Sequence, residues 1–123
     1  MISVGCVAGS QVVDGGWIET PNNTAVISGQ SVVLRCRSDS GVSEWYHTPI
    51  GGRIYRIAVG HVSRFGCTVQ NQFSSVYSVV TDGVQRPKCD LVINNTDSSL
   101  TGLYTCLSYD GHATAANVTA IGQ

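Results

Sequence analysis

The chain has 123 residues, the size of one domain with room for a sizeable core, and a formal net charge of −1. A charge so close to zero leaves no electrostatic footprint for nucleic acid or an anionic membrane, which argues against both as partners. Charged residues make up only 12% of the chain, against roughly a quarter in an average soluble domain, and this favours a surface covered by glycans or by a partner.

Short β-rich runs separated by Gly, Asn, Asp and Pro follow one another from Trp17 onward, without helical periodicity. Trp17–Thr20 is predicted to be an edge strand, broken at Pro21 and continued by Thr24–Ile27, because an edge strand tolerates a proline. The later predicted strands are Ser31–Arg37, Val42–Thr48, Arg53–Val59, Phe73–Thr81, Cys89–Asn94, Gly102–Tyr109 and Ala113–Ile121. We expect one domain over residues 17–121, preceded by an N-terminal extension or leader remnant over residues 1–16.

The composition also indicates the compartment. Five cysteines in a small domain favour an oxidising environment. Three N-x-T sequons, at Asn22, Asn94 and Asn117, agree with secretion and are predicted glycosylation sites. Alternation with the apolar Ile93 and Val118 places Asn94 and Asn117 on solvent-facing sides of their strands. No apolar run approaches the roughly 18 residues that span a bilayer, so we expect an extracellular chain that meets a membrane only through an anchor outside this sequence.

One constellation carries most of the information. Cys36 and Cys106 lie in separate predicted strands, Trp45 follows shortly after the first, and Tyr104 precedes the second in the pattern Tyr-x-Cys. These residues resemble the framework of the immunoglobulin superfamily, and of its variable set in particular. The similarity runs from about Trp17 to Ile121, nearly the whole chain.

The resemblance implies an all-β, two-sheet Greek-key immunoglobulin-like sandwich of variable type, because the long Cys36–Cys106 separation leaves room for two extra strands. It also implies a Cys36–Cys106 bridge with Trp45 packed on it, and a Tyr104 hydroxyl bonded to backbone upstream. The chain departs from the family where Leu100 replaces the usual acidic residue. It also lacks the Phe-Gly-x-Gly that follows the second cysteine in antigen receptors, which indicates a divergent, non-antigen-receptor lineage.

The remaining cysteines are Cys6, Cys67 and Cys89. Cys89 shares the parity of the apolar Leu91 and Ile93, and Cys67 lies in the long segment before the Phe73–Thr81 strand. We predict a Cys67–Cys89 bridge that pins this segment to the sheet. Pairing of Cys6 with either residue, or an intermolecular bond, remains open at this point.

Catalysis and metal binding are not expected. No C-x-x-C is present, and His47, His61 and His112 show no ligand spacing, so we expect no metal and no cofactor. No G-x-S-x-G, H-E-x-x-H or phosphate-cradling loop appears either, so we expect a protein that is not an enzyme.

The candidate partner-binding residues are Tyr46, Arg53, Tyr55, Leu107 and Tyr109. If the tryptophan of its strand points inward, Tyr46 points outward, and the same alternation turns Leu107 and Tyr109 outward. In variable-set domains these positions form the front sheet, which commonly meets a partner, and Tyr and Arg are enriched at interface hot spots. We expect the glycosylation sites to leave this face free, because Asn94 maps to the opposite sheet and Asn22 and Asn117 map near sheet edges.

We therefore expect the recognition or adhesion domain of a cell-surface receptor. Its partner would be a protein, with self-association (homophilic, allorecognition-type binding) as one form. The alternative is a soluble secreted module of innate immunity, such as a lectin-like pathogen-binding domain.

Overall fold

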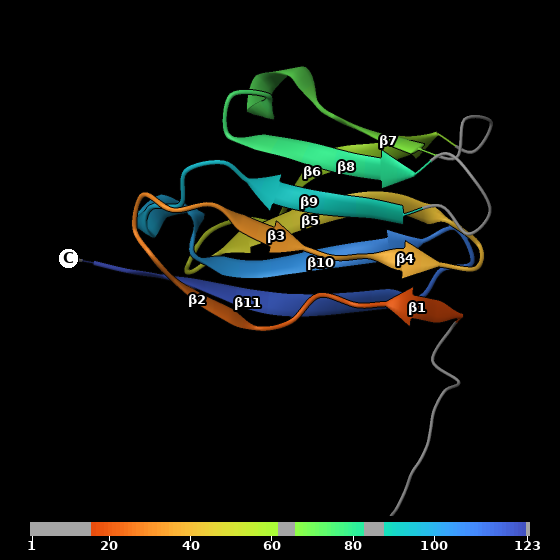
Figure 1. Ribbon diagram of the computed structural model, residues 1–123, viewed down its shortest axis with the longest axis horizontal. Helices are drawn as coiled ribbons and strands as arrows, with labels where there is room; N and C mark the ends of the chain where they lie inside the picture. The colour runs from red at the N-terminus through yellow and green to blue at the C-terminus, as the bar shows by residue number, and fades with distance from the viewer. Residues whose placement is uncertain (1–15, 62–65, 83–87, 123) are drawn as a thin grey trace, which may run out of the picture.

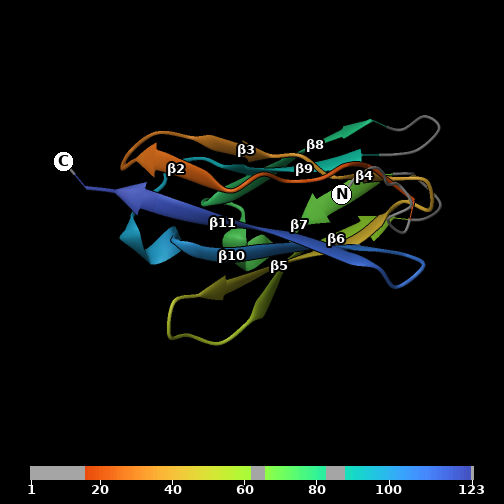
Figure 2. The same cartoon turned by 90° about the horizontal axis from the view of Figure 1, so that it is seen from below.

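The computed structural model describes residues 16–61, 66–82 and 88–122, which form two β-sheets packed face to face (Figures 1 and 2). The back sheet contains β1 (Trp17–Glu19), β3 (Val32–Leu34), β4 (Arg37–Ser38), β8 (Tyr77–Asp82) and β9 (Lys88–Ile93). The front sheet contains β2 (Thr24–Ile27), β11 (Ala113–Ile121), β10 (Gly102–Ser108), β5 (Val42–Pro49), β6 (Tyr55–His61) and β7 (Gly66–Val69), in that spatial order. Among the described residues the only helical segments are short 3-10 turns, such as Asn71–Phe73 and Ser98–Leu100. The predicted all-β, immunoglobulin-like sandwich is confirmed.

The first predicted strand is wrong in one respect, because its two halves belong to different sheets. β1 pairs antiparallel with β4 of the back sheet, whereas β2 pairs parallel with β11 of the front sheet. The crossing lies at the buried Pro21. Proline has no N–H for a ladder, so the chain can leave one sheet there without losing a donated bond.

The back sheet is also interrupted between β3 and β4, within the predicted strand Ser31–Arg37. The Cys36 amide donates to Asp90 Oδ1 at 3.0 Å, and the Cys36 carbonyl accepts from the Cys89 amide at 2.9 Å. A buried carboxylate therefore replaces the ladder carbonyl that Cys36 would otherwise meet. Lys88 Nζ lies 3.6 Å from the other Asp90 oxygen, which partly offsets the charge.

Two disulfides cross the sandwich. The Cys36–Cys106 bridge joins residues 70 apart in the sequence, and the Cys67–Cys89 bridge joins residues 22 apart. Both predicted pairings are confirmed, and Cys6, with the rest of residues 1–15, lies outside the described residues. Trp45 is fully buried beside them, and its Nε1 donates to the Cys89 carbonyl at 2.7 Å.

Inward-facing apolar side chains of both sheets complete the core around the bridges. As alternation predicts, Val32 and Leu34 are buried and Val33 between them is exposed. The largest other members of the core are Ile57, Tyr77, Leu91, Ile93, Leu100, Tyr104 and Val118. The Tyr104 hydroxyl donates to the Leu100 carbonyl at 2.6 Å, so the expected tyrosine corner is present.

Sequence patterns missed one strand. β7 pairs with β6 at the edge of the front sheet and contains Cys67, in a segment for which no strand was predicted. The run Cys67-Thr68-Val69 contains β-branched residues that favour a strand, but it is too short to predict one by itself. The predicted strand Phe73–Thr81 begins late, at Tyr77, because Asn71–Phe73 forms a 3-10 turn.

Candidate interaction surface on the front sheet

The outward face of the front sheet is set by the inward direction of Trp45. Cross-strand register places Trp45 opposite Cys106, so the intervening positions, Tyr46 opposite Thr105 and Glu44 opposite Leu107, face away from the core. The predicted outward positions of Tyr46 and Leu107 follow, and both side chains are half-buried on this face.

Tyr46 belongs to a polar network that lies flat on the sheet. Its hydroxyl donates to Glu44 Oε1 at 2.9 Å, and Arg56 Nη1 donates to Glu44 Oε2, also at 2.9 Å. Arg56 Nε donates to Gln70 Oε1 at 3.4 Å, which joins β5, β6 and the residue after β7. Burial, and then the bond to Glu44, raise the pKa of Tyr46, so its hydroxyl remains a proton donor at neutral pH.

Tyr109 lies at the far end of the same face and is 41% exposed. Its hydroxyl reaches across β5 to Gly60 of β6, where a Cβ would lie 2.7 Å from the tyrosine oxygen. The same Cβ would lie 2.1 Å from the Val42 carbonyl oxygen. Only glycine therefore fits beneath the Tyr109 hydroxyl.

We name these outward residues the front-face cluster; its members are Glu44, Tyr46, Arg56, Leu107 and Tyr109. Arg56 and Glu44 were not among the predicted site residues. Alternation could have found Glu44, which lies two residues before Tyr46 on the same strand. Arg56 follows only from the register between β5 and β6, which pairs it with Tyr46 and cannot be read from either strand alone.

Two of the predicted site residues do not join the cluster. Tyr55 is opposite the inward-facing His47, and its hydroxyl lies 2.9 Å from His47 Nδ1. Its ring stacks on Phe73 with centroids 5.1 Å apart, so Tyr55 packs into the sandwich. Arg53 is exposed in the loop that joins β5 and β6, before the strand begins. Tyr55 thus lies on the strand next to Tyr46, as predicted, but it turns away from the outward face, and Arg53 lies outside that strand, so the prediction that both belong to the partner-binding surface is wrong.

A buried aromatic network lies directly behind this face. His47 stacks on Tyr104 with ring centroids 4.2 Å apart, and its Nε2 lies 3.3 Å from the Thr101 carbonyl oxygen. The hydroxyls of Tyr77 and Tyr104 are 2.9 Å apart. Burial raises the pKa of both tyrosines far above the usual value and lowers the pKa of His47. The three rings are therefore neutral at physiological pH and form a rigid support for β5 and β10.

The three sequon asparagines are all exposed, but they do not all avoid the front sheet. Asn94 follows β9 of the back sheet and Asn22 precedes β2 at the front-sheet edge. Asn117 of β11, by contrast, lies opposite Leu103 of β10 and shares the outward face with Tyr46. Asn117 lies near an edge of the sheet, as expected, since β11 is second from it. The expectation that the outward face carries no glycosylation site is nevertheless wrong, because the pairing with Leu103 turns Asn117 onto that face.

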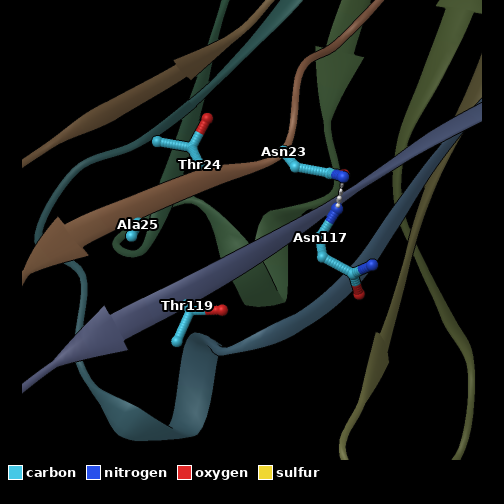
Figure 3. Close-up of a pocket in the computed structure, with 5 residues that line it drawn as sticks. All are labelled: Asn23, Thr24, Ala25, Asn117 and Thr119. Carbon is cyan, nitrogen blue, oxygen red and sulfur yellow. Dashed lines mark hydrogen bonds between the residues drawn. The ribbon is translucent and has the colours of Figure 1, made fainter.

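Asn117 also borders a shallow depression of about 240 Å³ between β2 and β11 (Figure 3). Its backbone amide donates to Asn23 Oδ1 at 2.9 Å, the contact drawn in Figure 3. The lining residues are Asn23, Thr24, Ala25, Asn117 and Thr119. Small amide and hydroxyl side chains in so open a hollow offer little apolar area to a ligand, so this depression is a weaker candidate than the cluster.

No protein-family model matches the chain, and a search of curated protein sequences finds no match either. Two disulfides in a small β domain point to an extracellular environment. Within residues 16–61, 66–82 and 88–122, no helix has the length and apolar character to cross a membrane. In the same part of the chain, no three His, Cys, Asp or Glu side chains gather where they could hold a metal ion.

Proposed function

We propose that the chain is a variable-type immunoglobulin-like domain of a cell-surface protein, and that it recognises a second copy of itself through the front-face cluster. The two strands β6 and β7, placed between β5 and β8 in the chain, support the variable-type assignment. The recognition role is supported by the cluster itself, which lies over the centre of a six-stranded sheet.

The observation that carries the proposal is the pairing of Glu44 with Arg56 on an exposed sheet face. A two-fold symmetric contact uses the same patch on both partners, so the patch must complement itself. An acid and a base side by side satisfy this condition, since a second copy can place its Arg56 against Glu44 and its Glu44 against Arg56. Such charges set register and partner choice more than they add affinity.

The aromatic members supply the apolar part of the proposed contact. Tyr46 and Tyr109 each combine a large ring with a polar hydroxyl, the kind of side chain enriched at interface hot spots. Leu107 of β10 lies opposite Glu44 of β5 and is half-buried. Because the neutral aromatic network behind β5 and β10 holds these strands in place, little ordering is needed on binding.

A glycan on Asn117 would restrict where the partner lies. Asn117 lies opposite Leu103 of β10. Tyr46 and Glu44 lie opposite Thr105 and Leu107, which are further along β10 from the glycosylation site. We therefore place the contact over the β5–β6 side of the sheet, toward Tyr109, with the glycan at its margin.

Sedimentation velocity of the secreted, glycosylated chain over a concentration series tests this function. We expect a reversible monomer–dimer equilibrium under non-reducing conditions, weakened by Tyr46→Ala or Tyr109→Ala. Val33→Ala, an exposed valine of the back sheet, serves as the matched control and leaves the equilibrium unchanged. A strict monomer would remove self-recognition and direct the search to a different protein or to a carbohydrate. A dimer that disappears only with reductant would indicate an intermolecular disulfide instead.

A further inference from the structure

The hydroxyl of Thr96 is buried without a use in the folded domain. Thr96 has 0% exposed surface, and its Oγ1 finds no hydrogen-bond partner among the described residues. A buried hydroxyl without a partner lowers the stability of the fold relative to a methyl group of similar size. Valine, which has nearly the same shape, would therefore suit this position better.

Thr96 is also the third residue of the sequon that begins at Asn94. Asn94 is exposed, and its Oδ1 accepts a hydrogen bond from Ser78 Oγ at 3.0 Å. This bond engages the oxygen of the amide and not the nitrogen to which a glycan would be attached. The folded domain thus presents the acceptor asparagine to solvent while it hides the hydroxyl that defines the acceptor sequence.

The segment between these residues is held at both ends. The Asn94 amide donates to the Val76 carbonyl at 3.0 Å, and the Thr96 amide donates to the Gln30 carbonyl, also at 3.0 Å. The Thr96 carbonyl in turn accepts from the Gly29 amide at 2.7 Å. An enzyme that distinguishes Thr or Ser at the third position must contact the hydroxyl, and it cannot do so while these bonds hold.

We propose that Asn94 is N-glycosylated before this segment folds, and that Thr96 keeps its hydroxyl for that step. The co-reactant is a lipid-diphosphate-linked oligosaccharide. A bond forms between Asn94 Nδ2 and the reducing-end C1, the bond from C1 to the diphosphate oxygen breaks, the lipid diphosphate leaves, and the amide nitrogen loses one proton. After folding, the hydroxyl is buried and the glycan stands on the solvent side of the back sheet.

The inference concerns the back sheet and is independent of the proposed contact through the front-face cluster. Substitution of Thr96 separates the two roles of the hydroxyl. We expect Thr96→Val, expressed in secreting eukaryotic cells, to lose the glycan on Asn94 and to keep the occupancy of Asn22 and Asn117, as read by glycopeptide mass spectrometry. Thr96→Ser should retain the glycan on Asn94.

Stability provides the second measurement. Asn94→Gln is the matched control, since it also lacks this glycan but keeps the buried hydroxyl. We expect the Tm of Thr96→Val to equal or exceed that of Asn94→Gln. A Tm several degrees below that control would show that the hydroxyl supports the fold, and an unmodified Asn94 in the wild-type chain would overturn the proposal.

The timing is tested with purified oligosaccharyltransferase and its lipid-linked oligosaccharide. The unglycosylated chain is offered in two forms, one native with both disulfides intact and the other reduced and alkylated. We expect transfer to Asn94 only in the reduced and alkylated chain. Comparable transfer to the native chain, or none to either form, would contradict the inference.

Discussion

Cys36 and Cys89 lie side by side in the back sheet, joined by a hydrogen bond of 2.9 Å from the Cys89 amide to the Cys36 carbonyl. Each sends its own disulfide across the sandwich, Cys36 to β10 in the middle of the front sheet and Cys89 to β7 at its edge. Trp45 completes the arrangement by donating to the Cys89 carbonyl. One point of the back sheet thus holds both the centre and the edge of the sheet that bears the front-face cluster.

Removing either bridge should lower stability according to the loop it closes. In the chain-entropy model the loss is about 4 kcal/mol for a Cys36→Ala/Cys106→Ala variant and about 3 kcal/mol for Cys67→Ala/Cys89→Ala. The longer loop accounts for the difference, since the separations are 70 and 22 residues. Equilibrium unfolding in urea, extrapolated to zero urea with the slope fitted separately for each variant, measures both losses of unfolding free energy. A larger loss for the shorter loop would show that native packing around the bridge, and not the entropy of the unfolded chain, dominates the loss of stability.

Removal of the tyrosine-corner hydroxyl should be among the more destabilising single-atom changes. Tyr104→Phe removes the hydroxyl that donates to the Leu100 carbonyl at 2.6 Å and lies 2.9 Å from the Tyr77 hydroxyl. Buried groups left without partners destabilise by about 1–3 kcal/mol, and urea unfolding should show a loss of this size. Tyr109→Phe, at an exposed position, is the control and should unfold like the wild type. Equal stability of Tyr104→Phe would contradict the role of the corner.

His47 makes stability depend on pH. Burial lowers its pKa, whereas in the unfolded chain an imidazole takes up a proton near pH 6.5, roughly its ordinary value. The unfolded state therefore binds more protons just below that pH. The stabilisation is complete above about pH 6.5 and is lost as the pH falls toward the native pKa of His47.

Thermal unfolding between about pH 7.5 and 5 checks this, because carboxyl groups titrate mostly below that range. We expect the Tm of the wild type to fall across the range and the Tm of His47→Gln to change much less. His112→Gln, at an exposed histidine, should keep the wild-type slope. A slope that survives in His47→Gln would assign the dependence to another group.

Gly60 should not tolerate any side chain. A Cβ there would lie 2.1 Å from the Val42 carbonyl oxygen, which is backbone and cannot move aside cheaply. Gly60→Ala should therefore destabilise the domain by about 1–3 kcal/mol and displace Tyr109 from the outward face. Gly122→Ala, where no neighbouring atom lies within 4 Å, is the control for urea unfolding. A Gly60→Ala variant as stable as this control would show that β5 and β6 can separate without loss.

Features within one strand, and the two disulfides that join strands, were predictable from the sequence, whereas the register between strands was not. Alternation correctly placed Leu34 inside and, once the resemblance had set Trp45 inward, placed Tyr46 outside, because side chains alternate with a period of two. The inward position of Tyr55 and the shared face of Asn117 depend on register with β5 and β10. Local sequence does not determine that register, since it follows from packing of the whole sheet.

The charge pair of Glu44 and Arg56 permits the most direct test of self-recognition. Glu44→Arg gives a face with two bases and Arg56→Glu a face with two acids, so each variant alone should lose the dimer through like-charge repulsion. Mixed in equal amounts, the two variants should form a heterodimer, which sedimentation velocity at low salt would detect. Two variants that each dimerise like the wild type, or a mixture that stays monomeric while the wild type dimerises, would contradict a two-fold contact through the front-face cluster.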